Sequence, residues 1–580
     1  MNLLLVNLTR FGDLLQTQPV VHGLRAQGHR VGLVCLENFA GAAALLEGVD
    51  HVAALPGSAL LAGIQPDGDW RTCTAGLMTW AERLREAYAP DAVLNLTATL
   101  GGRLLARLLA GNGNGRGEGA GGDLRGFGLD PFGFGVNADP WSAFLQASTR
   151  QRGCSPFNLV DLFRMAAGVG DVDPVYQLRA PAPDALAEAG ARLAQAAPPD
   201  HAGYVAMQLG ASEERRRWPV AHFAVLAARL WRDLRLVPVL LGAGGERALG
   251  ARLRTALAED AERASTDPTP CIDLIGATSL PQLAATLRHM RLLVTNDTGT
   301  MHLAAGLDVP VLAIFLATAQ PWDTGPYRQD CCCLEPALDC HPCPFGAPCP
   351  HGERCRRTIS ADTAFSLAHS KLTTGTWADP AAAPNAAPAP LREARVWYTL
   401  HEADTPPALS SGIVMPGRGF MDLASLSGHE AEDRTRWIRL QRHFYRQFLD
   451  RSPAHSVGQP AAAGRPCPAI LPPQAPPALS DTLRDRAVDE LRQAAALLHL
   501  MGEQGSLLKV RPSDMAKSRF LGTVSRVQAL WDNSTLFNVL GHLWLCESQG
   551  AGGTLDAVLA LAAAYRGLVR TWLAHLSPSA

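Results

Sequence analysis

Lysine is nearly absent from this chain of 580 residues, since it occurs only at Lys371, Lys509 and Lys517 and arginine carries almost all of the positive charge. The sequence also lacks a dense basic run with interleaved aromatic residues, and its formal net charge at pH 7 is −2. A polynucleotide partner would need a positive surface to attract its phosphates. We therefore expect no nucleic-acid binding.

Basic residues are also missing before the first apolar run, where a secretory signal would carry them, and Arg10 and Asp13 interrupt that run early. The most apolar late stretch, residues 555–576, contains one aspartate and two arginines. This composition favours a buried or amphipathic helix over a membrane-spanning one. The sequence predicts a cytoplasmic protein.

The length and composition predict several domains. A chain of 580 residues exceeds what one core usually supports, and its 47% apolar residues can fill more than one. We expect an N-terminal Rossmann-like acceptor domain at 1–180, a Rossmann-like nucleotide-sugar domain at 200–365, a Pro/Ala-rich linker region at 378–480 and a helical module of unknown role at 481–580.

Apolar strand-like runs alternate with helical periodicity in both of the first two domains. The expected strands are residues 2–8, 30–36, 51–55 and 92–96, and then 204–209, 236–241, 272–275, 292–295 and 309–315. This alternation is typical of a doubly wound α/β fold, with parallel sheets covered by helices on both faces. The Gly/Asn-rich stretch 111–135 predicts a loop, and the Ala/Pro-rich stretches 378–390 and 460–477 predict tethers.

Polar groups that follow two of these strands are candidates for chemistry, because ligands of open α/β sheets lie at the carboxyl ends of the strands. Asp13 follows the first strand and fits either a catalytic carboxylate or a first-turn residue that complements the helix dipole. Residues 295–302 join a strand end to a helix start, whose free amides suit a pyrophosphate. Arg215, Arg216 and Arg217 form either a cationic strand-end cluster or a solvated face.

Three motifs, in this order, resemble the signatures of the lipopolysaccharide heptosyltransferases of glycosyltransferase family 9. They are Arg10-Phe-Gly-Asp13 with Pro19, Gly210-Ala-Ser212 followed by Trp218-Pro219, and Asp297-Thr-Gly-Thr-Met-His302. The resemblance covers roughly residues 1–365 and implies a GT-B fold of two facing Rossmann-like domains. It also implies inverting, metal-independent transfer of a heptose from an ADP-sugar to a lipopolysaccharide acceptor, with no cofactor required.

The resemblance further implies roles for particular residues. Asp13 would be the general base, and Arg216, at a position where the family usually has Lys, would stabilise charge. The implied donor-binding residues are Ser212, Glu246, Asp297, Thr298, Gly299 and His302. The sequence departs from the family at Thr300, where Pro is common, and at residues 316–318, where a Gly-Pro-Thr turn is usual.

Other readings keep the fold but change the function. The donor could be a different nucleotide sugar, the acceptor could be a protein, or the fold could serve as a non-catalytic binding scaffold. A lipid-linked glycan acceptor would be compatible with transient association with the inner face of the cytoplasmic membrane.

Most of the thirteen cysteines lie between residues 331 and 355. Cys340, Cys343, Cys349 and Cys355 have intervening spacings of two, five and five residues. Such a set could close a structural zinc site, but a local disulfide or reduced thiols fit equally well. We expect no catalytic metal under any of these alternatives.

Overall fold

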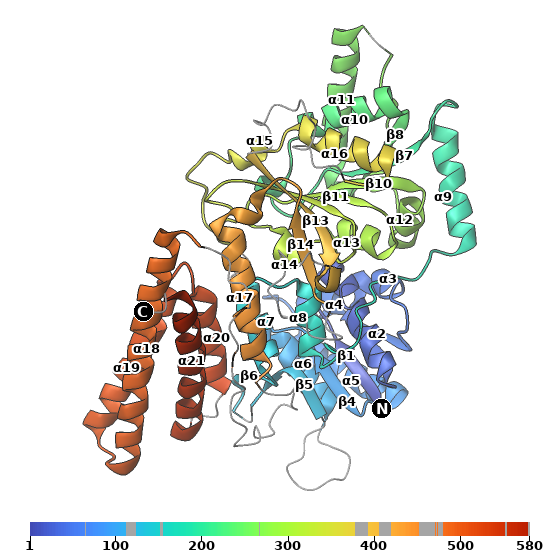
Figure 1. Ribbon diagram of the computed structural model, residues 1–580. Coiled ribbons are helices and arrows are strands. Elements are labelled where there is room, and N and C mark those ends of the chain that lie inside the picture. Colours follow the sequence, from blue (N-terminus) through green and yellow to red (C-terminus); the bar gives the residue numbers. More distant parts are fainter. Residues whose placement is uncertain are drawn as a thin grey trace.

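Two sheets of mainly parallel strands, each flanked by helices, lie one above the other, with a helical module beside them (Figure 1). The doubly wound α/β class and the helical C-terminal region are confirmed. The computed structural model describes residues 1–63, 65–111, 123–130, 132–150, 155–265, 267–377, 393–404, 419–451, 470, 473, 479–550 and 554–577.

The N-terminal sheet has the strand order β3-β2-β1-β4-β5-β6 and is parallel except for β6. Its strands are β1 Asn2–Val6, β2 Arg30–Leu36, β3 His51–Leu55, β4 Ala92–Asn95, β5 Asp123–Leu129 and β6 Gly135–Asn137. In β1, Leu3 and Leu5 pack on one face of the sheet while Leu4 and Val6 pack on the other. Helices cover both faces, as the continuous apolar strand predicted. The helices are α1 Phe11–Leu15, α2 Gln18–Ala26, α3 Ala40–Ala43, α4 Gly57–Gly63, α5 Trp70–Tyr88, α6 Leu100–Ala110, α7 Pro140–Arg150 and α8 Leu159–Ala166.

Strand β5 corrects the prediction of a loop over 111–135. The strand pairs with β4 in parallel, and Leu124 and Phe127 are buried. Gly126 of β5 is required for a steric reason, because a Cβ at this position would lie 2.2 Å from the carbonyl oxygen of Asn95. A glycine stands here because two backbone segments approach closely, not because the chain forms a flexible loop. The rest of the expected loop lies largely outside the described residues.

The C-terminal sheet has the order β14-β13-β12-β11-β10-β7-β8-β9. Its strands are β7 Gly203–Gln208, β8 Leu236–Leu241, β9 Ile272–Asp273, β10 Met290–Asn296, β11 Val311–Ile314, β12 Cys332–Pro336, β13 Ala394–His401 and β14 Met421–Ser425. The surrounding helices are α9 Pro183–Ala196, α10 Val220–Leu234, α11 Arg247–Ala264, α12 Leu280–Leu287, α13 Gly299–Gly306, α14 Pro321–Thr324, α15 Cys355–Thr358 and α16 Ala361–Thr374. All five strands expected in this domain are present.

Strands β13 and β14 lie inside the region 378–480 that the sequence analysis treated as a linker, and helix α17 Asp433–Leu449 follows them. β13 pairs antiparallel with β12, and β14 pairs antiparallel with β13. The Ala/Pro-rich composition of the region led to a linker prediction, although the region contains the short β-forming run Val396-Trp-Tyr-Thr-Leu400. The stretch 378–390 and nearly all of 460–477 lie outside the described residues.

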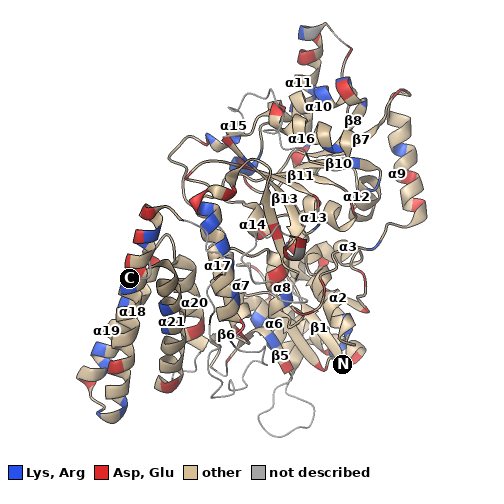
Figure 2. Cartoon of the chain, viewed as in Figure 1, with Lys and Arg blue, Asp and Glu red and all other residues tan. Residues whose placement is uncertain are grey.

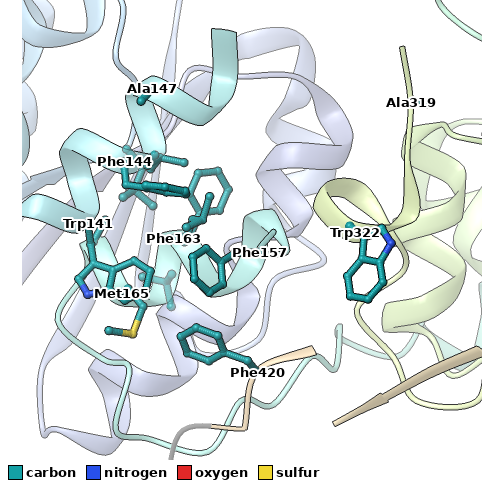
Figure 3. Close-up of a cluster of buried hydrophobic side chains, with 14 of the residues drawn as sticks. Trp141, Phe144, Ala147, Phe157, Phe163, Met165, Ala319, Trp322 and Phe420 are labelled. Carbon is teal, nitrogen blue, oxygen red and sulfur yellow. The ribbon is translucent and has the colours of Figure 1, made fainter. Parts of the chain in front are cut away.

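The segment from β13 to α17 also contacts the N-terminal domain. Phe420 packs edge-on against Phe157, with ring centroids 5.7 Å apart, and against Trp141 at 6.1 Å (Figure 3). Tyr445 of α17 lies 5.7 Å from Phe144. Helix α17 is also rich in arginine (Figure 2). This segment therefore joins the two Rossmann-like domains.

The helical module consists of α18 Asp481–Val510, α19 Asp514–Asp532, α20 Asn538–Gly550 and α21 Leu555–Leu576. It packs on α17, since the ring of Trp572 stacks 4.8 Å from Phe444 and 5.4 Å from Trp437. Among the described helices, α21 alone is long and apolar enough to cross a membrane. Tyr565, Leu568 and Trp572 of α21 are fully buried in the module, while 28% of the residues in its most apolar window are buried, so the helix packs by one face.

Candidate functional site

The two Rossmann-like domains touch where helix α1 meets the start of helix α13. A Cβ on Gly12 would lie 2.9 Å from the His302 ring and 3.1 Å from the Gly299 Cα, and a Cβ on Gly299 would lie 2.3 Å from the Phe11 ring. Only glycine at both positions allows this approach. The structure thus brings the segment that carries Asp13 against the Asp297–His302 string.

Asp13 lines a cavity of about 230 Å³ that both domains form. Phe127, Phe157 and Phe163 supply apolar walls, and Figure 3 shows Phe157 and Phe163 within the larger buried cluster. The described lining residues are Thr9, Asp13, Leu96, Thr97, Ala98, Thr99, Phe127, Leu145, Ser148, Ser155, Phe157, Leu159, Leu162, Phe163, Asp323 and Thr324. This lining contains two carboxylates and several hydroxyls but no lysine, arginine or histidine. The lining therefore offers apolar walls and hydrogen-bonding groups but no cation.

Arg216 forms a nearly buried ion pair with Asp297 across the end of the C-terminal sheet, and each side chain is 9% exposed. The guanidinium also donates to the Ser212 hydroxyl at 3.0 Å. Three predicted site residues from two separate motifs therefore meet at one point. Because an arginine stays protonated, Arg216 can orient groups and stabilise charge but cannot transfer a proton.

The neighbouring Arg215 points elsewhere. Its Nε lies 2.7 Å from the carboxylate of Glu213, and Nη1 donates to the Ala347 carbonyl at 2.7 Å. Of these two arginines of the predicted cluster, only Arg216 reaches Asp297.

Glu246 closes the other side of the site. Its Oε2 accepts from the Gln208 side-chain amide at 2.9 Å and from the Ala243 backbone amide at 3.0 Å. A Cβ on Gly210 would lie 1.5 Å from Glu246 Oε1, so this carboxylate fits only above a glycine. Gln208 Oε1 accepts from the Thr300 hydroxyl at 3.3 Å, a bond that the family's common proline could not make. Gln208 links Glu246 to α13.

Asn296 organises this edge of the sheet from within. Its side-chain amide donates to the carbonyls of Leu209 at 3.0 Å and Gly210 at 3.1 Å, while its Oδ1 accepts from the Trp218 backbone amide at 2.8 Å. Sequence reasoning missed both Asn296 and Gln208. The available signal was that each is a polar residue at the buried carboxyl end of a strand.

The remaining predicted donor residues lie at the start of α13. Thr298 is the N-cap residue, its hydroxyl lies 3.1 Å from that of Thr295, and Gly299 opens the helix. His302 is 4% exposed in the first turns, with its ring against Gly12. All of these positions surround one helix terminus that faces α1.

Cys340, Cys343, Cys349 and Cys355 are free cysteines close to one another. Burial raises the pKa of the Cys343 thiol, and the proximity of the other three cysteines raises it further. Within the described ranges, no group of three or more His, Cys, Asp or Glu side chains has the arrangement of a metal site. The structural zinc alternative stays a prediction that metal analysis of the purified protein would test.

Two facing Rossmann-like domains, with Asp13 on one and the start of α13 on the other, have the arrangement of the GT-B class of glycosyltransferases. Residues 161–352 match the profile of glycosyltransferase family 9 (heptosyltransferase). The resemblance to this family is therefore confirmed for this part of the chain.

Individual relatives also match parts of the chain. The chain is 32% identical to lipooligosaccharide heptosyltransferase 2 of Haemophilus influenzae over 18% of its own length and 28% of the relative's. It is 32% identical to lipopolysaccharide heptosyltransferase 1 of Pseudomonas aeruginosa over 28% of its length and 42% of the relative's. These matches span less than half of the relatives. The solved family 9 glycosyltransferase of Veillonella parvula has a TM-score of 0.50 at 18% identity, covering 64% of this chain and 97% of that one, which supports the shared fold.

Proposed function

We propose that this chain is an inverting, metal-independent glycosyltransferase that moves a heptose or similar sugar from an ADP-sugar to a hydroxyl of a lipopolysaccharide core or related surface glycan. One observation carries the proposal: the helix of Asp13 lies against the amino terminus of α13, across the cleft between the two domains. A base and a diphosphate site then face the same reacting centre.

In the proposed reaction, the acceptor hydroxyl oxygen attacks the anomeric carbon while the bond from that carbon to the phosphate oxygen breaks. Asp13 takes the hydroxyl proton, and ADP leaves with the bonding electron pair. A single displacement of this kind inverts the anomeric configuration. The free amides and dipole of α13, together with Arg216, stabilise the charge that develops on the diphosphate. Asp297 holds Arg216 in place, and Glu246 is positioned to bind the nucleoside.

A second candidate keeps the mechanism but uses a protein hydroxyl as the acceptor. The lining of the cavity beside Asp13 supports it, because apolar walls and two carboxylates suit an uncharged serine or threonine better than an acidic sugar. No cation among the described lining residues could offset a negative acceptor.

Mass spectrometry of products tests both candidates. Purified protein is offered a panel of nucleotide sugars, with a lipid A core extract in one arm and serine-containing peptides in the other. Mass added to the glycan supports the first acceptor, and mass added to the peptide supports the second. Absence of transfer and of donor hydrolysis in every arm would leave only the non-catalytic scaffold.

Arg216→Ala is expected to weaken nucleotide-sugar use much more than Arg215→Ala. Loss of Arg216 leaves the Asp297 carboxylate nearly buried and unneutralised beside the diphosphate. We therefore expect kcat/KM for the donor to fall by roughly 30-fold or more, which corresponds to about 2 kcal/mol of lost transition-state stabilisation. Arg215 pairs with a partly exposed glutamate, so its loss should change kcat/KM less than about threefold. Side-by-side donor kinetics measure the difference, and equal losses would contradict the assignment of Arg216.

A further inference from the structure

The turn that joins α18 to α19 exposes large apolar side chains. Leu507 is 55% exposed, Val510 77%, Met515 64% and Leu521 51%. These four side chains lie within fifteen residues, at the end of α18 and the start of α19, and so many exposed apolar residues in one short segment indicate an interaction surface more than a single one does. We call residues 507–521 the hairpin tip.

The hairpin tip is also the most basic part of the module. It carries Lys509, Arg511, Lys517 and Arg519 against one carboxylate, Asp514, in a chain whose formal net charge is −2. Lys509 pairs with Asp556 of α21. Within the described parts of the chain, no hydrogen bond or ion pair engages the other three cationic side chains. These cations are therefore available to an external anion.

The geometry of α18 holds the tip away from the body of the protein. The start of α18 is fixed on α17, because the Ser480 backbone amide donates to Asp433 at 2.9 Å. Thirty helical residues at 1.5 Å each then carry the chain about 45 Å to the tip. Figures 1 and 2 show this turn at the end of the module that lies away from α17, with basic residues on it.

We propose that the hairpin tip docks on the surface of an anionic lipid bilayer. Exposed apolar side chains surrounded by arginine and lysine have the composition of an interfacial membrane anchor: the apolar groups enter the headgroup boundary and the cations meet anionic headgroups. The tip is a convex turn, and a fluid lipid surface accepts such a shape without a matching groove. The surface lies outside the residues assigned to catalysis, so this proposal does not depend on the proposed function.

Co-sedimentation of the full chain with lipid vesicles tests the proposal. We expect binding to vesicles of phosphatidylethanolamine and phosphatidylglycerol, weaker binding to phosphatidylcholine vesicles, and loss of binding as salt rises. The double variant Arg511→Glu/Lys517→Glu should bind the anionic vesicles at least about twentyfold more weakly, because each cation near the surface contributes about fivefold. Val510→Glu/Met515→Glu should bind at least about tenfold more weakly.

Two controls carry single substitutions of the same kinds elsewhere. Arg492→Glu alters an exposed arginine of α18 about 27 Å from the tip, and Val225→Glu alters a 44% exposed valine of α10. Both should bind vesicles as the parent does, and thermal melting checks that every variant folds. Equal binding to both lipid compositions, or unchanged binding of the tip variants, would overturn the proposal. A different result would also overturn it. If the parent binds no vesicles but forms a dimer in analytical ultracentrifugation, and only the tip variants abolish that dimer, the tip binds a second copy of the chain instead of a membrane.

Discussion

Replacing Asp13 with asparagine is expected to lower the turnover of sugar transfer by about two or more orders of magnitude while leaving donor binding nearly unchanged. Asparagine has nearly the same shape but cannot accept a proton, so the acceptor hydroxyl would attack without a general base. The proposed diphosphate contacts lie on the other domain, around Arg216 and α13, and the substitution changes none of those residues.

Single-turnover kinetics with the preferred donor, together with a thermal shift produced by ADP, separate the two effects. Asp323→Asn is the matched comparison, because Asp323 is the other carboxylate that lines the same cavity. A large loss in Asp13→Asn and a small one in Asp323→Asn supports the assigned base. If the sizes of the two losses are reversed, Asp323 is the base, and full turnover in both variants refutes a carboxylate base in this cavity.

Much of this site could be predicted from the sequence because its parts are local. The strand before Asp13 is a continuous apolar run, and the Asp297–His302 string joins a strand to a helix, so both segments had to lie at strand carboxyl ends. The order of the three motifs then placed them on facing domains. The structure has both of these predicted strand-to-helix turns.

The contacts that assemble the site are not local and left little signal in the sequence. Gln208 and Glu246 meet across 38 residues, and Asn296 holds backbone carbonyls more than eighty residues away. The sequence does not distinguish a buried side-chain amide that positions site residues from one that only makes hydrogen bonds within the core. Strands β13 and β14 were missed for a related reason, since β14 pairs with β13 and the other partner of β13, strand β12, lies beyond the Ala/Pro-rich stretch.

The β13–α17 segment gives the domain interface a buried charge network as well as aromatic contacts. Asp161 of α8 accepts from Arg164 at 3.1 Å, from the Tyr327 hydroxyl at 2.6 Å and from the Met421 backbone amide at 3.0 Å. These three partners belong to the N-terminal domain, the C-terminal domain and strand β14. Burial raises the pKa of Asp161, and the charge of Arg164 offsets part of that rise. One carboxylate thus connects three parts of the chain.

Asp161→Ala is therefore expected to lower the free energy of unfolding by about 3–5 kcal/mol, because it leaves the Arg164 guanidinium buried without its carboxylate. Tyr327→Phe keeps the ion pair but removes the hydroxyl that donates to Asp161 and accepts from Arg164 at 3.3 Å, and it should cost about 1.5–3 kcal/mol. Denaturant titration followed by tryptophan fluorescence compares the two variants. If Asp161→Ala costs no more than Tyr327→Phe, the carboxylate does not hold the domains together, and the aromatic contacts of Phe420 and Tyr445 must carry the interface instead.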